Sequence, residues 1–242
     1  MIYEQEMVQE LQVWQRKMMR DPRIFSRLSK SMQDKINSWI PEKVHQAITA
    51  TIKQMIRGVL FGAKWTTRNR KKTLSIEESD TIADEKIKFY QHAAAAEGAV
   101  TGAGGLWLGL ADFPLLIAIK IKLLFEIASV YGFSVNDYKE RVYILHIFQL
   151  AFSSDIHRKD VFITMQHWDE KSKSLPEDLN EFKWRSFQQE YRDYIDLAKL
   201  AQLIPVIGAP VGAVVNYRLI RKLGFTAKMA YHMRWAEAQQ LI

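Results

Sequence analysis

The sequence predicts an all-α protein, a globular bundle of many helices around a central glycine-rich apolar helical hairpin. Apolar residues recur every three or four positions in nearly every segment, which is the spacing of a helix face. The alternating patterns typical of β-strands are scarce. The 242 residues are 48% hydrophobic, a composition typical of a folded core rather than a disordered chain. We therefore expect one helical domain over residues 1–242.

Helix signals divide the first half of the chain at regular intervals. The first helix carries an apolar stripe from Met7 to Met18, and a second should begin at Pro22. Pro41 opens a third helix with a broad apolar face. Ser75 and Glu78 have the spacing of a capping box, which predicts a further helix as far as Ala94.

Glycine sets the centre of the chain apart. Five of the eleven glycines lie between residues 98 and 109, ahead of an apolar run that should end at Gly132. Glycines four residues apart form a strip without side chains, where another helix backbone can approach closely. We predict such packing contacts at three pairs: Gly98 and Gly102, Gly105 and Gly109, and Gly208 and Gly212.

The second half again follows helical spacing. Asn136 or Asp137 can cap a helix through Phe152, and Pro176 should begin a long helix. Residues 153–183 are polar and resemble an insertion or a mobile layer that holds one short helix. Several prolines and glycines after residue 204 precede a last helix.

Two apolar segments, residues 98–119 and 200–217, raise the question of a membrane span. Asp112 near the centre of the first costs about 2.5–3.5 kcal/mol on insertion scales, and glycines and prolines weaken both segments further. We interpret them as core helices, with a re-entrant or conditionally inserting hairpin as the alternative. The sequence alone leaves the two open.

Basic residues are concentrated in one segment. Residues 57–72 hold six lysines and arginines and no acidic residue, although the whole chain has a net charge of only +7. An aromatic residue followed by a polybasic run suits the anionic cytoplasmic membrane surface. We therefore predict lipid contact, with a solvated basic loop as the alternative, through Trp65, Arg68, Arg70, Lys71 and Lys72. No signature of a nucleic-acid-binding motif accompanies the run.

The sequence contains no recognisable catalytic motif. It has no cysteine, and its six histidines lack metal-ligand spacing, so neither a metal nor a cofactor is predicted. Four polar residues with apolar neighbours are candidates for buried sites: Glu97, Asp112, Glu126 and Asn216. Asp112, two residues before Pro114, fits a helix N-cap. An acid–base pair of Glu97 and Asp112 is the weaker catalytic hypothesis.

Several blocks of the sequence resemble the EcsC family of bacteria. They are AEGAVTGAGG at 96–105, LADFP at 110–114, EIA at 126–128, YG at 131–132 and IPVIGAPVGA at 204–213 with Asn216. SKSMQDKIN at 29–37 and PEKVH at 41–45 resemble its Gram-positive branch. The family takes its name from an operon that also encodes the ATPase and membrane subunits of an ABC transporter. The resemblance supplies no catalytic residues.

From these observations we expect a non-enzymatic helical accessory protein, peripheral at the cytoplasmic membrane face, with ABC transporter components as partners. The N-terminus lacks the basic and apolar regions of a signal peptide, which favours a cytoplasmic location. Two alternatives stay open: an enzyme of unknown class using Glu97 and Asp112, and a scaffold that binds a transporter membrane subunit. The sequence does not indicate an oligomeric state.

Overall fold

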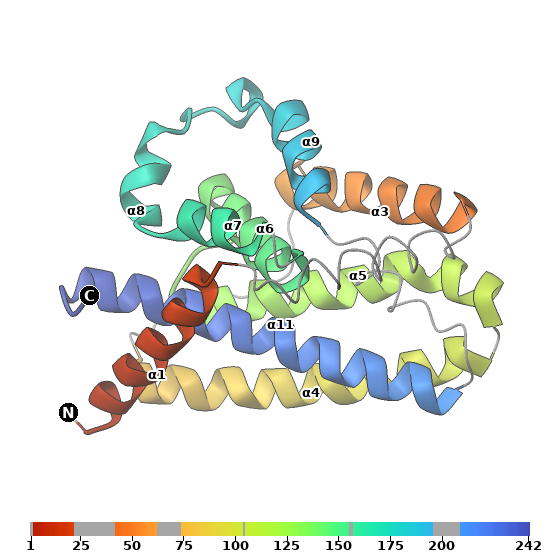
Figure 1. The fold of residues 1–242 in the computed structure, drawn as a ribbon, viewed down its shortest axis with the longest axis horizontal. Coiled ribbons are helices and arrows are strands. Elements are labelled where there is room, and N and C mark those ends of the chain that lie inside the picture. Colours follow the sequence, from red (N-terminus) through yellow and green to blue (C-terminus); the bar gives the residue numbers. More distant parts are fainter. Residues whose placement is uncertain (1, 22–41, 62–73, 104, 155–156, 196–208) are drawn as a thin grey trace.

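A computed structural model describes residues 2–21, 42–61, 74–103, 105–154, 157–195 and 209–242 (Figure 1). These residues form α-helices and two short 3₁₀ helices, without a β-strand among them, so the predicted all-α class is confirmed. The helices are α1 (Ile2–Met19), α3 (Glu42–Phe61), α4 (Ile76–Ala103), α5 (Gly105–Val130), α6 (Tyr138–Phe152), α7 (Arg158–Met165), α8 (Trp168–Lys171), α9 (Trp184–Tyr194) and α11 (Ala209–Ala238).

Three long helices form the centre of the molecule. Helix α4 runs antiparallel to both α5 and α11, and the three lie side by side in Figure 1. Helices α4 and α11 contact each other over a long stretch. Asp84 of α4 pairs with Lys228 of α11, and several turns away Gly98 of α4 lies against Gly212 of α11. This layer carries most of the buried polar side chains described below.

The remaining helices cover this layer. Helices α3 and α6 pack on α5, whereas α1 crosses α11 and α4 on another side (Figure 1). Helices α7 and α8 lie beside α6, and their residues Phe162, Met165 and Trp168 are buried. The segment predicted as a polar insertion therefore contributes large apolar side chains to the core.

Two predicted helix caps are confirmed. The Ser75 backbone N–H donates to Glu78 Oε2 at 2.9 Å, and the Glu78 N–H donates to Ser75 Oγ at 3.2 Å, which is the reciprocal pattern of a capping box. Asp137 caps α6 by accepting from the Lys139 N–H at 2.9 Å. Gly132 follows α5 with a φ of 85°, a conformation that glycine adopts without strain.

Two helix starts were predicted wrongly. Asp112 is not an N-cap, because α5 already begins at Gly105 and continues through Pro114. Proline costs this helix one hydrogen bond, but burial of Phe113 and Leu116 beside it favours the continuous helix.

Pro176 does not begin the long helix either. Two short 3₁₀ helices, Ser172–Ser174 and Leu179–Glu181, lie on either side of it, and α9 begins only at Trp184. The Asp178 carboxylate accepts from the Asn180 N–H at 2.8 Å, and this local turn competes with a helix. The helix predicted from Pro22 lies outside the described residues.

Candidate functional site

A buried lysine marks the crossing of α4, α5 and α11. Lys120 is fully buried, and its Nζ donates to the Leu116 carbonyl at 3.2 Å and to Asn216 Oδ1 at 3.3 Å. Asn216, also fully buried, donates to the Gly212 carbonyl at 3.2 Å. A Cβ at Gly98 would lie 2.7 Å from that same carbonyl oxygen, so the two helix backbones touch here.

Burial lowers the pKa of Lys120 to about 7, and the Glu97 carboxylate only partly opposes this shift. The sequence analysis brought Glu97 and Asn216 forward but missed the lysine between them. The only feature of the sequence that could have pointed to Lys120 is its position inside the mostly apolar run of α5. That signal is ambiguous, because Lys122 in the same run instead pairs with Glu126.

Lys120→Met should remove a pH dependence of stability. Because the folded-state pKa is lower than the unfolded value, the unfolded chain binds the extra proton, and stability rises from pH 7 to about pH 10. The wild type should gain at most about 1.4 kcal/mol per pH unit there, and the variant should lack that gain. Urea unfolding at a series of pH values measures it. Equal slopes in the two proteins would contradict the prediction.

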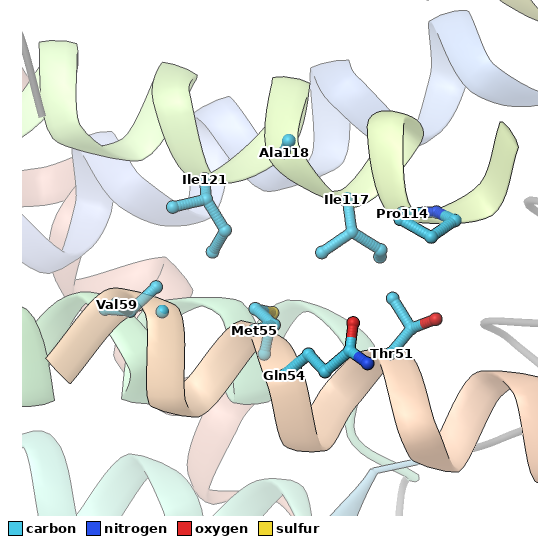
Figure 2. Close-up of a pocket in the computed structure, with 9 residues that line it drawn as sticks. Thr51, Gln54, Met55, Val59, Pro114, Ile117, Ala118 and Ile121 are labelled. Carbon is cyan, nitrogen blue, oxygen red and sulfur yellow. The ribbon is translucent and has the colours of Figure 1, made fainter. Parts of the chain in front are cut away.

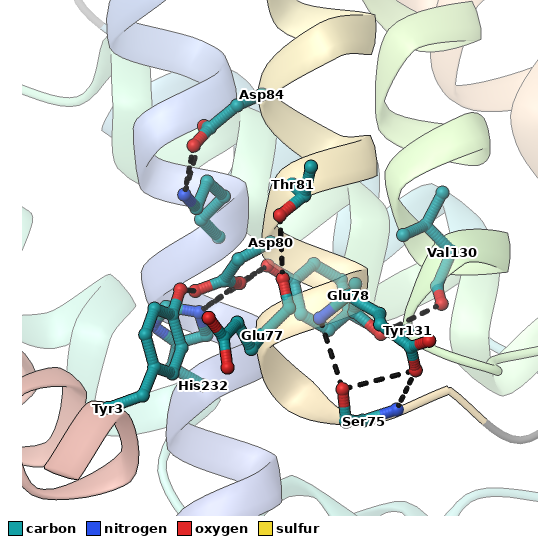
Figure 3. Close-up of polar contacts among 12 residues, drawn as sticks. Tyr3, Ser75, Glu77, Glu78, Asp80, Thr81, Asp84, Val130, Tyr131 and His232 are labelled. Atoms are coloured by element: carbon teal, nitrogen blue, oxygen red, sulfur yellow. Dashed lines mark hydrogen bonds and ion pairs between the residues drawn. The ribbon is translucent and has the colours of Figure 1, made fainter.

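A second polar cluster around Asp80 of α4 joins this helix to α1, to α11 and to the residue just after α5 (Figure 3). Tyr3 of α1 donates to Asp80 Oδ2 at 2.5 Å, and Tyr131, just after α5, donates to Oδ1. His232 Nε2 of α11 lies 2.6 Å from the same Oδ1. Asp80 and His232 are 4% and 1% exposed, so this cluster lies in the interior.

Burial of Asp80 opposes its ionisation, but hydrogen bonds from His232, Tyr131 and Tyr3 together lower its pKa. This carboxylate therefore stays charged and ties α1, α11 and the residue just after α5 to α4. Its stabilising contribution is complete above the ordinary carboxyl pKa and is lost as the pH falls through the lower folded-state pKa.

Asp80→Asn should destabilise the protein by about 1–3 kcal/mol at neutral pH, since an amide cannot accept every bond that the carboxylate does. The difference between variant and wild type should shrink below pH 4, as the pH falls from the ordinary carboxyl pKa towards the lower folded-state pKa of Asp80. Exposed Asp160→Asn on α7 is the matched control. The prediction fails if the stability difference is unchanged from pH 7 to pH 3.

A third cluster lies next to the second. Arg234 donates to Glu140 Oε2 of α6 at 2.5 Å and also to Asp169, and Tyr231 donates to Glu140 Oε1 at 2.7 Å. The Arg234 guanidinium lies 3.6 Å from the centroid of the Phe133 ring. Burial lowers the pKa of Arg234, but Glu140, Tyr143 and Asp169 together more than offset this, so the pKa lies above its usual range and the arginine stays charged. The sequence analysis did not find this cluster.

The sequence-predicted carboxylates do not form one centre. Glu97 is partly buried near Lys120, whereas Asp112 is partly buried in α5 and makes no hydrogen bond or ion pair with Glu97. Glu126, partly buried, accepts from Tyr90 at 2.8 Å and lies 2.9 Å from Lys86 Nζ.

Other predicted site residues lie where no side-chain surroundings are described. Trp65, Arg68, Arg70, Lys71, Lys72 and Gly208 fall outside the described residues, and Gly102, Gly105 and Gly109 lie in α4 and α5 without described surroundings. Their lipid and packing roles stay predictions. Within the described ranges, no three histidine, aspartate or glutamate side chains group closely enough to hold a metal ion.

An apolar groove separates α3 from α5 (Figure 2). It has a volume of about 180 Å³. Its lining is mostly aliphatic: Thr51, Gln54, Met55, Gly58 and Val59 from α3, and Pro114, Ile117, Ala118 and Ile121 from α5. Thr51, the most polar buried residue of the lining, is only 9% exposed. The groove therefore suits an apolar occupant.

Comparison with known proteins decides the family. The model of the EcsC protein family matches residues 5–236, nearly the whole chain. The chain belongs to the EcsC protein family. It is 45% identical over 231 residues to "Protein EcsC" of Bacillus subtilis (strain 168), covering 95% of both chains. The resemblance inferred from the sequence blocks is thus confirmed.

A second relative is more distant. The EcsC-family chain is 31% identical over 157 residues to "Uncharacterized protein YdbA" of Bacillus subtilis (strain 168), covering 64% of this chain and 57% of that protein. No solved structure matches the fold. None of the described helices combines the length and apolar character that crossing a membrane requires.

Proposed function

We propose that this EcsC-family protein is a non-enzymatic accessory protein of an ABC transporter system, bound peripherally at the cytoplasmic membrane face. The observation that carries the proposal is the apolar groove between α3 and α5. Its aliphatic walls offer contact area to an apolar segment but few groups that could orient a polar substrate. The proposed occupant is a helix of the transporter membrane subunit.

The charge of the neighbouring sequence supports a membrane-facing position for this groove. Helix α3 ends at Phe61, which is 40% exposed, and the polybasic residues follow within eleven positions. Arg57, one turn before Phe61, is exposed on the same helix. An apolar groove on a helix that is followed in the sequence by concentrated positive charge suits a partner embedded in an anionic bilayer.

The alternative, an enzyme that uses Glu97 and Asp112, has less structural support than the groove. Glu97 lies near Lys120 in the tightly packed crossing of three helices, and Asp112 has no polar partner among the residues that the structure describes. Neither residue lines the apolar groove. An acid–base pair would need both carboxyl groups to face one substrate.

The lipid contact can be tested by flotation with phosphatidylglycerol vesicles at low salt. Neutralising Arg68, Arg70, Lys71 and Lys72 to glutamine should abolish flotation, since each basic residue contributes about 1 kcal/mol at such a surface. The control neutralises four exposed cations elsewhere: Lys17, Lys53, Lys183 and Arg218. Equal loss in both variants would mean that net charge alone drives binding. No flotation of the wild type would refute the lipid contact.

The groove can be tested separately by co-purification with the membrane subunit of an ABC transporter of the kind encoded in the operon that names the family. Gly58→Leu should fill the groove, because a Cβ at Gly58 meets no atom within 4 Å and the fold can accept it. Lys53→Leu adds the same side chain at an exposed position of α3 outside the groove lining. Loss of the partner only in Gly58→Leu supports the proposal, and retention in both variants contradicts it.

A further inference from the structure

A second groove lies between α1, α4 and α11, away from the apolar groove. It has a volume of about 290 Å³, at the small end of ligand pockets. Ile87, Phe225 and Met229 contribute apolar surface to its lining, and Phe225 is 41% exposed. The polar lining residues are Glu10, Asp84, Lys88, Gln91, Arg221 and Lys228.

Gln91 is the unusual member of this lining. Only 4% of this residue is exposed, and its amide makes no hydrogen bond to another described residue. The amide is not one of the fully buried polar groups that lack a partner, so it reaches the open space of the groove that it lines. The groove is the open space next to this amide, so a bound molecule can supply the partner.

The three cations that line the groove differ in whether they are paired with a carboxylate. Lys228 is neutralised by Asp84, with Nζ 2.9 Å from both carboxylate oxygens (Figure 3). Lys88 of α4 and Arg221 of α11 are exposed and have no partner through their side chains in the described residues. Two unpaired cations from facing helices therefore line the same groove as the unpaired amide.

We infer that this groove binds a small amphipathic anion, a phosphate ester with a short apolar chain. Arg221 and Lys88 bind the phosphate oxygens, Gln91 donates its amide hydrogens to them, and the chain packs on Ile87 and Phe225. Arginine presents two parallel donors to such a group, which suits a phosphate. This inference does not rest on the proposed function.

Glu10 makes a distinctive contribution to the same site. It is exposed on α1, lines the groove and has no partner within the described residues. A carboxylate there repels an incoming anion, so removing its charge should strengthen binding. A gain in affinity cannot arise from partial unfolding, which makes Glu10 the most useful position for a test.

Hexyl phosphate is the probe, measured by isothermal titration calorimetry at low salt. We expect saturable 1:1 binding, at least tenfold weaker binding of inorganic phosphate, and no binding of hexanol. Lys88→Gln with Arg221→Gln should reduce the affinity at least tenfold, and Gln91→Leu severalfold. Glu10→Gln should increase it severalfold.

The matched control is Lys53→Gln with Lys183→Gln, which removes two exposed cations elsewhere whose side chains have no partner within the described ranges. Unchanged affinity in this control supports the site. The inference is overturned if hexyl phosphate does not bind saturably, if the control loses as much affinity as the groove variant, or if Glu10→Gln weakens binding. Thermal unfolding of each variant without the probe shows that the fold is retained.

A competition experiment distinguishes the two possible sources of such a phosphate, a lipid headgroup and a soluble ester. Phosphatidylglycerol vesicles compete with hexyl phosphate if the groove receives a lipid headgroup, and they do not if it receives a soluble ester. Either result is compatible with the site. Vesicle flotation that survives the Lys88 and Arg221 substitutions keeps the lipid contact of the proposed function distinct from this groove.

Discussion

Replacing Arg234 by methionine is expected to lower the free energy of unfolding by about 3–5 kcal/mol, the largest effect of any substitution considered for this protein. The guanidinium and Glu140 form an ion pair whose side chains are only 6% and 5% exposed. Without Arg234, the Tyr231 hydroxyl is the one hydrogen-bond partner that the described residues leave to the Glu140 carboxylate. An uncompensated charge in the interior costs far more than the contact itself.

Urea unfolding followed by far-UV circular dichroism measures this loss. A double variant, Glu140→Leu with Arg234→Met, should recover much of it, because it removes both charges together. Lys173→Met is the surface control: its ion pair with Glu170 leaves both side chains at least 70% exposed, so the cost should stay below about 1 kcal/mol. Equal costs at Arg234 and Lys173 would show that the buried pair is not stabilising the fold.

Gly98→Ala is expected to destabilise the protein by about 1–3 kcal/mol, although alanine is the better helix former. Its Cβ would lie 2.7 Å from the Gly212 carbonyl oxygen and 2.8 Å from Asn216 Nδ2. The first of these atoms belongs to the backbone, so the whole of α11 has to shift. The second belongs to the amide that holds Lys120.

Gly58→Ala supplies the opposite control in the same experiment. It replaces another helical glycine, but nothing lies within 4 Å of the added Cβ. The smaller entropy of the unfolded chain should then stabilise this variant by about 0.4–1 kcal/mol. If Gly98→Ala is also neutral or stabilising, the backbones of α4 and α11 do not touch as described.

The sequence predicted local features well because neighbouring residues decide them. The capping box at Ser75 and the cap at Asp137 involve partners two or three positions away, and the stripe from Met7 to Met18 depends only on helical period. The errors at Asp112 and Pro176 arose where a local cap signal competed with other forces. Helix α5 runs through Pro114 because its apolar side chains pack in the core. Helix α9 begins later than predicted because the turn at Asp178 competes with a helix.

The candidate sites were harder to predict, since their members lie far apart in the chain. Asp80 and His232 are separated by 152 positions, and Glu140 and Arg234 by 94. A single histidine or arginine in a helical pattern carries no sign of its partner. Asn216 and Glu97 were recognisable only as polar residues in apolar surroundings, and Lys120 between them was missed.

By itself, the sequence determined that this protein is helical, where several helices begin and end, and that it resembles the EcsC family. These properties follow from short-range periodicity, capping and recognisable blocks. Only the tertiary structure decided which charges are paired in the interior and which residues line each groove. Partner choice depends on the register of α4 against α5 and α11, and that register is set by close backbone contact such as Gly98 on Gly212.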